Sequence, residues 1–472
     1  MSGRYSNGEV KVRPGVYFRE TNGGGTELSA VRNGVVAVAF RANWGPLGSV
    51  VTLTSPAEIA DIFGDDAAAN SNVAILDKIF LGGASEIKAI RVGSGGTQAS
   101  ITLKDDADAD VVTLLAKYAG TRELTVTIKD SLSVENQREC IIYAGTKELT
   151  KVSFAKGAAE VDALIAAIAA NETSVVKATK VAEGSGVLAA ATQTAFSTKG
   201  VSPEITNSDY TNAFALLEAT QFNVMCVDTN DVAVHALVAS FINRANDSGI
   251  MAVAVVGEPT TVEYATRKAN AAAFNSQNII YVLNGFKVDD EVYDGFNAAA
   301  VVAGLVAYLP ASDSPTHKTI PGASEIVGAL TNTQIIECLN SGAIVFTVSA
   351  TGAVWIEQGI NTLTVLTADQ DAGWKKIRRT KCRFELIQRI LENTEGIIGN
   401  VGNDTNGRQT FIAIANGVIN QMIAEKKLVS GSVTEDPSNP AKGDSAWFII
   451  SVVDLDSIER VYITYRFAFA EA

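Results

Sequence analysis

The chain has 472 residues and a formal net charge of −14, with 52 acidic and 38 basic residues. Hydrophobic residues make up 47% of it and charged residues 19%, which is typical of a globular chain with large cores and excludes a disordered one. The acidic balance argues against bulk nucleic-acid binding, which needs a basic surface. The sequence predicts no signal peptide and no membrane-spanning helix, because no run of about 18 apolar residues occurs.

The N-terminal residues 1–25 have the composition of an extended arm. Pro14 and Gly15 interrupt a stretch of apolar residues that favour strands. These residues are Val10, Val12, Val16, Tyr17 and Phe18. A glycine triplet follows the arm: Gly23, Gly24 and Gly25. Such a triplet could cradle a phosphate, but neither a lysine nor a helix start follows it, so a flexible hinge is favoured.

Residues 26–93 predict the first part of an α/β core. Residues 34–40 form a buried type of strand, and residues 55–63 begin like a capped helix with Ser55 as N-cap and Glu58 three positions later. A second helix is expected over 72–81 and a strand over 86–92. At about residue 94 the composition shifts to short strands and one amphipathic helix at 158–170, so residues 94–202 are interpreted as an inserted, small β-rich domain.

Residues 203–352 predict the second part of the core, because strands and helices alternate there. Continuous apolar strands are expected over 221–228, 250–257 and 279–283. Helices are expected between and after them, over 232–245, 261–275 and 296–309. Apolar strands joined by helical crossovers indicate a mostly parallel sheet that is covered on both faces.

Open α/β sheets bind ligands at the carboxyl ends of their strands, which makes Asp228 a candidate enzyme site. Against this hypothesis, the sequence has no phosphate-binding glycine motif, no nucleophile elbow and only two histidines, His235 and His317. Four aspartates resemble part of a calcium loop but lack its glycine and distal glutamate, so a solvated turn is favoured. They are Asp105, Asp106, Asp108 and Asp110. We therefore predict no catalytic residue, no metal and no cofactor.

The cysteines lie far apart and form neither a CxxC pair nor a metal-binding spacing. This pattern predicts buried free thiols and folding in a reducing compartment. The four positions are Cys140, Cys226, Cys338 and Cys382.

Residues 353–472 predict an α+β C-terminal domain. It contains the densest basic cluster of this acidic chain: Lys375, Lys376, Arg378, Arg379, Lys381 and Arg383. Two interpretations stay open, a solvated edge between a strand and a helix, or a contact with an acidic protein partner. A helix over 409–427 and a strand over 447–453 follow.

The residues from 457 to 470 carry the clearest strand pattern of the chain, with period-two alternation. One face carries five apolar side chains: Val461, Ile463, Tyr465, Phe467 and Phe469. No later segment is predicted that could pair with this strand, and an unpaired apolar strand is an aggregation hazard. It either returns to its own sheet or pairs with another copy of the chain.

The sequence resembles the contractile tail sheath proteins of long-tailed phages and of phage-derived particles such as R-type bacteriocins. An ordered set of segments carries the resemblance: VRPGVY at 12–17, WGP at 44–46, SPTHK at 314–318, EQGINTLT at 357–364, IGNV at 398–401, NGR at 406–408 and DSIER at 456–460. No single segment is decisive, and residues 97–200 carry no usable likeness.

The resemblance implies an α/β multidomain structural subunit with extended terminal arms, and not an enzyme. Such subunits polymerise around an inner tail tube, between a baseplate and a tail terminator, in a metastable extended state. They then contract and drive the tube through a target cell envelope. The particle is a virion tail or phage-like particle assembled in the cytoplasm of the bacterial host, with no direct nucleic-acid contact and no membrane insertion by the sheath.

By the same resemblance, the two arms would link neighbours by strand exchange, and the basic run 375–383 would face the tube. The alternatives are an α/β enzyme with a ligand site near Asp228, or a non-contractile shell-forming protein.

Overall fold

The computed structural model describes residues 2–5, 9–18, 23–24, 33–64, 71–181 and 186–467. The chain divides into two compact units, where the sequence suggested five segments. The first unit comprises Met1–Val36, Leu81–Ser85 and Gln221–Ala472. The second comprises Ala37–Phe80 and Glu86–Thr220.

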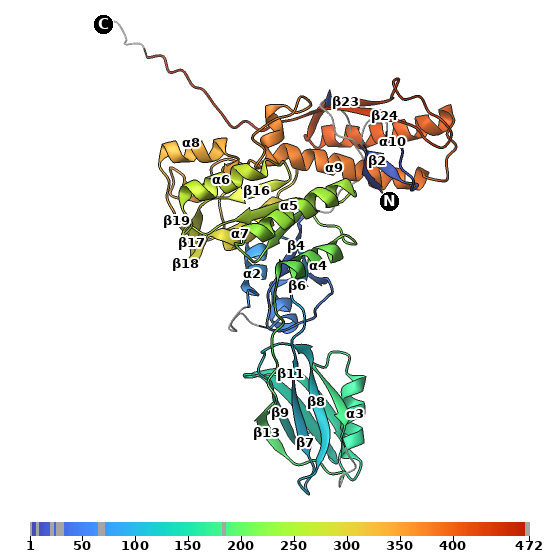
Figure 1. Cartoon of the computed structure of the whole chain (residues 1–472), viewed down its shortest axis with the longest axis vertical. Helices are drawn as coiled ribbons and strands as arrows, with labels where there is room; N and C mark the ends of the chain where they lie inside the picture. Colours follow the sequence, from blue (N-terminus) through green and yellow to red (C-terminus); the bar gives the residue numbers. More distant parts are fainter. Residues whose placement is uncertain are drawn as a thin grey trace. The chain divides into compact units, whose positions relative to one another are not determined.

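A parallel sheet forms the core of the first unit (Figure 1). Its strands lie in the order β20-β16-β15-β14, and their bounds are Val224–Val227 (β14), Val253–Gly257 (β15), Ile279–Val282 (β16) and Ala343–Ile344 (β20). Every pairing among these four strands is parallel, which confirms the predicted parallel core. Every residue of β14, β15 and β16 is buried, and all except Gly257 carry an apolar or aromatic side chain, as expected for a sheet covered on both faces.

Four helices belong to this part of the first unit: α5 (Val232–Asp247), α6 (Tyr264–Phe274), α7 (Gly295–Tyr308) and α8 (Asn332–Asn340). The side chain of Asp231 caps α5 by accepting a hydrogen bond from the Ala233 amide. Helix α7 is apolar on all sides and almost entirely buried. Gly82 permits its close packing, since a Cβ there would lie 2.2 Å from the Val301 carbonyl oxygen.

Two small antiparallel groups complete this part of the first unit. One has the order β18-β17-β19, and the other is the β21–β22 pair. Their bounds are Gly285–Val288 (β17), Glu291–Tyr293 (β18), Ala323–Val327 (β19), Phe346–Val348 (β21) and Val354–Ile356 (β22).

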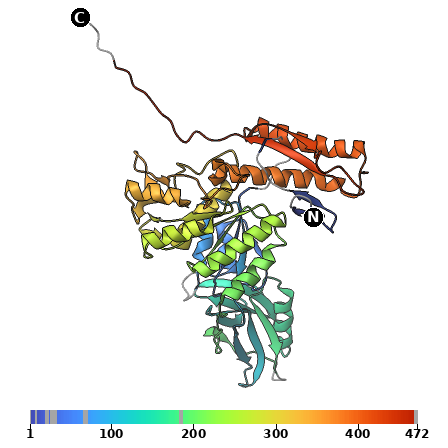
Figure 2. The ribbon, with the colours of Figure 1, turned by 45° about the horizontal axis from the view of Figure 1, so that its top comes forward.

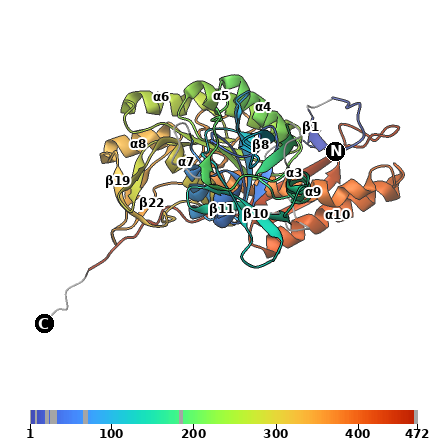
Figure 3. The same cartoon turned by 90° about the horizontal axis from the view of Figure 1, so that it is seen from below.

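The C-terminal part of the first unit packs two long helices against an antiparallel pair of strands. The short helix η2 (Ala372–Lys375) leads into α9 (Ile377–Thr394), and η3 (Glu395–Ile397) precedes α10 (Thr405–Ala424); the strands are β23 (Leu428–Glu435) and β24 (Phe448–Asp454). Helices α9 and α10 lie side by side (Figures 2 and 3). Their shared core includes Leu386, Ile419 and Val433, with Phe448 and Ile450 of β24 packed against it.

The N-terminal residues lie within the first unit and form short strands. β1 (Ser2–Arg4) pairs in parallel with β2 (Val16–Phe18), so Val16, Tyr17 and Phe18 pair within their own chain here. Between these strands, Val10 and Val12 are exposed by 70% and 99%.

The predicted glycine hinge is not a free joint in the structure. Gly23 and Gly24 form β3 (Gly23–Gly24), and Gly23 pairs with Val452 of β24 in antiparallel orientation. Gly25 lies outside the described residues. Local composition does not reveal this backbone partner, which lies more than 400 residues later in the chain, and a hinge at Gly23 and Gly24 stays a prediction.

The second unit contains strands β4 (Val35–Phe40, from its third residue), β5 (Val51–Leu53) and β6 (Glu86–Arg91), in the order β4-β6-β5. Its helices include η1 (Pro56–Glu58), α1 (Ile59–Ile62), α2 (Ala74–Leu81, up to residue 80) and α4 (Asn207–Leu217). The predicted capping box is present, with the amide of Ser55 donating to the Glu58 carboxylate at 3.2 Å. Arg91 is buried and donates to the carbonyl oxygens of Ala42 and Gly45, which fixes the turn between them.

The rest of the second unit is a β-rich body with one helix (Figure 1). Its two sheets have the orders β11-β10-β9-β13 and β12-β8-β7. The bounds are Gln98–Lys104 (β7), Asp110–Ala119 (β8), Thr125–Asp130 (β9), Gln137–Ala144 (β10), Lys147–Ala155 (β11), Glu160–Ala170 (α3), Val176–Lys180 (β12) and Ala191–Ala195 (β13). A buried ion pair between Arg138 and Glu160 (2.8 Å) joins β10 to the start of α3.

Within the described ranges, no helix is both long and apolar enough to cross a membrane.

Candidate assembly site at the base of the C-terminal arm

The segment after β24 does not form the strand that its sequence predicts. Residues 455–467 have no regular secondary structure, and the chain leaves the α9–α10 layer as an extended trace (Figures 1 and 2). Val461, Ile463, Tyr465 and Phe467 are exposed by 71%, 65%, 73% and 89%. Phe469 lies outside the described residues. A strand needs hydrogen-bonding partners, and the described part of the chain supplies no strand that pairs with residues 460–467. We call residues 454–459 the arm base and residues 460–467 the C-terminal arm.

The arm base begins with a doubly bonded carboxylate. Arg379 of α9 donates from Nε and Nη2 to Asp454, with Nη2 at 2.7 Å, and the same guanidinium also binds Asp371. Burial alone would lower the pKa of Arg379, but the hydrogen bonds and charges of Asp454 and Asp371 raise it above its ordinary value. The amide of Leu455 then donates to the carbonyl oxygen of Lys427 at 3.0 Å.

Lys376 provides the next attachment of the arm base. Its Nζ lies 2.5 Å from the Asp456 carboxylate and 3.4 Å from that of Glu459. The lysine side chain is 19% exposed and that of Glu459 is 7% exposed, so this contact is shielded from water. Shielded pairs are screened by salt less than exposed ones.

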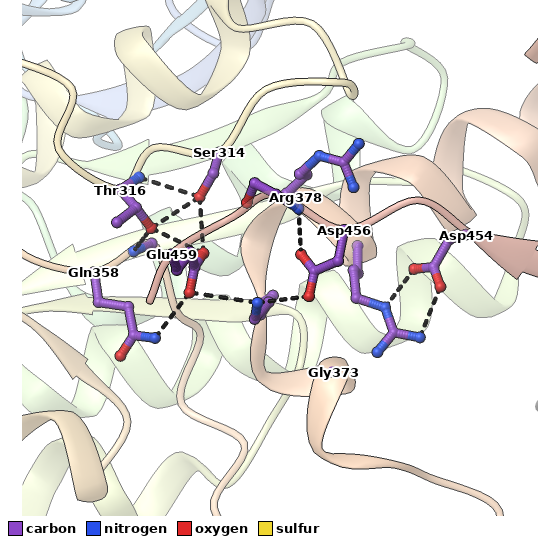
Figure 4. Close-up of polar contacts among 12 residues, drawn as sticks. Ser314, Thr316, Gln358, Gly373, Arg378, Asp454, Asp456 and Glu459 are labelled. Carbon is purple, nitrogen blue, oxygen red and sulfur yellow. Dashed lines mark hydrogen bonds and ion pairs between the residues drawn. The ribbon is translucent and has the colours of Figure 1, made fainter. Parts of the chain in front are cut away.

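Glu459 has further donors from two other segments (Figure 4). Its Oε1 accepts hydrogen bonds from Ser314 Oγ (3.3 Å) and Thr316 Oγ1 (3.1 Å), while its Oε2 accepts one from Gln358 Nε2 (3.0 Å). Together with Lys376, these groups satisfy a carboxylate that is almost completely removed from solvent. A buried carboxylate without such partners would cost several kcal/mol.

The loop that holds Glu459 is itself fixed. His317 has a left-handed backbone (φ 57°), and its ring stacks on Trp355 with a centroid distance of 4.0 Å. The amide of His317 donates to the carbonyl oxygen of Ile356 at 2.8 Å, and Thr316 Oγ1 accepts a hydrogen bond from the Gly359 amide. The donors of Ser314 and Thr316 are therefore held in place around Glu459.

The basic run at 375–383 is mostly used inside the subunit. Lys376 and Arg379 bind the arm base as described above. Arg383 lies over the Trp374 ring at 3.9 Å and donates to Gln277. None of these contacts involves the side chain of Lys375.

The prediction that the whole run faces a partner was wrong for two of its members, Arg378 and Lys381. Arg378 is 2% exposed and donates to the Ser312 carbonyl oxygen at 2.7 Å. Lys381 donates to the carbonyl oxygens of Val306 and Leu309 at the end of α7. Burial lowers the pKa of Lys381 to about 7.

The spacing of these residues along α9 does not by itself indicate burial, because charged residues on one helix face usually lie in water. Arg378, Lys381, Glu385 and Arg389 follow one another at spacings of three or four residues, so they share one face of α9, and all four are buried. The acidic residues of the arm base carried no local signal either, because their partners lie 75 to 145 residues earlier in the chain.

The alternative site near Asp228 contains buried polar residues. Asp228 is fully buried, and His235 Nε2 lies 2.9 Å from the Thr229 carbonyl oxygen. Burial lowers the pKa of His235. One strand further along, the buried Glu258 accepts hydrogen bonds from Tyr281 and Asn270. Among the described residues, no group of three potential metal ligands occurs.

A protein-family model matches the central part of the chain. Residues 203–362 match the family model described as the phage tail sheath protein central domain. Over these residues the chain is similar to a tail sheath central domain. The family resemblance recognised in the sequence is thereby confirmed, and the matched family and the structural neighbours below are structural sheath proteins and not enzymes.

Two curated relatives come from Bacillus subtilis strain 168. The phage-like element PBSX protein XkdK is 31% identical over 190 residues, which are 39% of this chain and 36% of that protein. This match therefore spans only about a third of that relative's length. The uncharacterized protein YqbK is 22% identical over 485 residues, covering 98% of each chain.

Solved structures share the fold over nearly the whole chain. The sheath tail protein of Desulfitobacterium hafniense has a TM-score of 0.68 at 20% identity and covers 93% of this chain and 100% of its own. The helical sheath of the anti-feeding prophage in its contracted state has a TM-score of 0.53 at 11% identity, covering 97% of this chain and 99% of its own. The chain thus has the mixed α/β, multidomain fold of sheath proteins.

Proposed function

We propose that this protein is the structural subunit of a contractile tail sheath. It polymerises around an inner tail tube in a metastable extended state, between a baseplate and a tail terminator, and contracts to drive the tube through a target cell envelope. The particle is a phage tail or a phage-like particle, assembled in the cytoplasm of the bacterial host. The observation that carries the proposal is the C-terminal arm, an alternating apolar segment with exposed side chains on a chain with the sheath fold.

The arm has the chemistry of a donated strand. Its alternating face would bury apolar area worth about 25 cal/mol per Å² in an acceptor sheet, and each main-chain hydrogen bond would add about 1 kcal/mol net. Left in water, the same side chains favour non-specific aggregation. Pairing with a second copy of the chain resolves this conflict.

The antiparallel pair β23–β24 is the acceptor that we propose. One face of it packs on α9 and α10, so an added strand would extend a surface that already has a core. The three-stranded sheet has the order β23-β24-β3, and among the described residues its β3 side is occupied by Gly23 and Gly24. A longer strand from a neighbour would bury more apolar surface there than Gly23 and Gly24 do.

The N-terminal arm would supply the second link, through Val10, Val12 and the residues of β2. Val10 and Val12 are exposed in the free subunit, which supports their availability to a neighbour. Pairing by Val16–Phe18 would require β2 to leave β1, a ribbon of three residue pairs. Lys375 is the member of the basic run that we retain as a candidate contact with the tube.

Electron microscopy of the purified protein tests the proposal. We expect tubes or long helical polymers, and we expect deletion of residues 461–472 to abolish them while the subunit keeps its circular dichroism spectrum and its cooperative thermal unfolding. A full-length chain that stays monomeric at every concentration would refute the sheath function. Tubes formed by the deletion variant would refute the role of the C-terminal arm.

A further inference from the structure

The arm base and the C-terminal arm are held very differently by their own subunit. Asp454, Asp456 and Glu459 are all bound by side chains of the first unit, and the Leu455 amide is bound by the Lys427 carbonyl oxygen. From residue 460 to residue 467, every side chain is exposed. The change falls at Glu459, whose side chain is 7% exposed.

We propose that Glu459 is the anchor that fixes the C-terminal arm to its own subunit, so that the arm base stays with the donor and only residues from 460 onward pass to a neighbouring copy. The inference rests on the proposed function and adds the point at which the exchanged segment begins. It also assigns Lys376, Gln358 and the Ser314–Thr316 loop the role of positioning residues for that anchor.

The geometry of the Glu459 contacts supports an anchor that resists pulling. Its two oxygens receive donors from three separate places in the chain: residues 314 and 316, residue 358 and residue 376. A pull along the arm would have to break these bonds together, because they converge on one carboxylate. Hydrogen bonds to a charged group are about twice as strong as neutral ones.

The charge distribution also explains why the free part of the arm begins at residue 460 and not earlier. Lys376 binds Asp456 and Glu459 at once, and this bridges the arm base over a span of three residues. Beyond Glu459, residues 460–467 are all exposed, so among the described residues the subunit no longer holds the arm. When neighbouring subunits move relative to each other, the flexible point of the link is then next to the anchor.

Limited trypsin digestion of the unassembled full-length chain tests the anchor. Trypsin cuts after arginine, so Arg460 and Arg466 are both cleavage sites. To cut after Arg460, the protease must also bind residues of the arm base. Arg466 lies in the C-terminal arm, so cleavage there serves as an internal reference. Cleavage of a held segment follows the population of its open form. We expect Lys376→Met and Gln358→Met each to raise the ratio of cleavage at Arg460 to cleavage at Arg466 about tenfold.

The matched control is Lys442→Met, which removes an exposed lysine from the loop before β24 and should leave the ratio unchanged. Thermal unfolding of each variant establishes that the subunit is folded. A ratio that stays at the wild-type value in both Lys376→Met and Gln358→Met overturns the anchor.

A cryo-electron microscopy map of the assembled polymer gives an independent test. We expect Glu459 to remain on Lys376 and the Ser314–Thr316 loop of its own subunit, with main-chain pairing to a neighbour starting at residue 460 or later. A map in which Glu459 has left that loop overturns the anchor while leaving strand exchange intact. If no polymer forms, the proposed function fails, and the digestion still decides whether Glu459 holds the arm base.

Discussion

Arg379 donates two hydrogen bonds to Asp454, the last residue of β24, and thereby ties the end of the C-terminal strand pair to the first turn of α9. The side chains of both residues are less than one fifth exposed. A two-pronged contact between a guanidinium and a carboxylate fixes direction as well as distance. The direction in which the chain leaves β24 is therefore set by a specific ion pair, before the arm itself begins.

Replacing Asp454 tests how much this pair stabilises the fold. We expect Asp454→Asn to lower the free energy of unfolding by about 1.5–3 kcal/mol, the usual worth of hydrogen bonds to a charged group. Urea unfolding followed by circular dichroism measures the change. Asp444→Asn is the control, since Asp444 is exposed and should cost less than about 0.5 kcal/mol. Equal stability of the two variants would contradict the prediction.

A second prediction concerns the buried Lys381 and follows from its pKa. Burial lowers this pKa from 10.5 to about 7 in the folded chain. Between these pH values the unfolded chain binds more protons than the folded one, so the stability rises with pH across that window. The limiting slope is about 1.4 kcal/mol per pH unit. Below about pH 7 both states carry the charge and this contribution levels off.

Lys381→Met isolates that contribution from the other titrating groups. We expect the wild type to gain stability relative to Lys381→Met as the pH rises from 7 to 10, measured by urea unfolding at each pH. At pH 7 the variant should also be less stable by about 1–3 kcal/mol, because the carbonyl oxygens of Val306 and Leu309 lose their donor. Parallel pH profiles for the two proteins would show that Lys381 does not titrate in this range.

The alternation of strands and helices in residues 203–352 was predictable from sequence, because the local hydrophobic patterns agree with the tertiary structure. The apolar run at 250–257 contains β15, and the segments expected as helices at 232–245 and 296–309 correspond to α5 and α7. A strand buried on both faces must be apolar throughout, and a crossover helix must span the sheet. Both requirements are visible in a single sequence.

The C-terminal arm shows where such reasoning stops. The alternation at 461–467 describes which face of a strand would be apolar, but a strand also needs a second backbone, and the sequence does not say which chain provides it. The prediction that the basic run 375–383 faces a partner met a related difficulty. Counting lysines and arginines indicates a basic surface, whereas Lys376 and Arg379 are matched by Asp456 and Asp454 from a distant part of the chain.

Acid should weaken the contacts that Glu425 makes with Arg389 of α9 and with Lys427, the residue before β23. Burial alone would raise the pKa of Glu425, but hydrogen bonds from Arg389 and Lys427 lower it from 4.5 to about 2. A carboxyl group with a lowered pKa contributes stability that is complete above 4.5 and is lost as the pH falls towards 2. We expect Glu425→Gln to be less stable than the wild type at pH 6 and to approach it at pH 2.5, as measured by thermal unfolding.

The tube contact can be tested separately from sheath assembly. If Lys375 faces an acidic tube surface, Lys375→Glu should reduce co-sedimentation of the sheath polymer with purified tubes, and the loss should be greatest at low salt. Self-polymerisation should be unaffected, because none of the contacts at the arm base involves this side chain. Lys442→Glu is the charge-matched control. Equal tube binding by both variants would exclude Lys375 from the contact.

The strongest prediction concerns the two faces of the C-terminal arm. Ile463 and Tyr465 lie on one face of the alternating segment, and Tyr462 and Thr464 lie on the other. In a donated strand the first face would enter the acceptor core, where an unpaired carboxylate costs several kcal/mol. We therefore expect the double variant Ile463→Asp, Tyr465→Asp to abolish polymerisation in sedimentation and electron microscopy.

The matched double variant Tyr462→Asp, Thr464→Asp adds the same charge to the same segment and serves as the control. Its carboxylates would face outward, so polymers should still form, with a critical concentration raised no more than about tenfold, equivalent to about 1.4 kcal/mol. In the free subunit all four positions are exposed, so neither variant should change the thermal stability of the monomer. Equal loss of polymers in both variants would mean that net charge, and not a buried strand face, controls assembly.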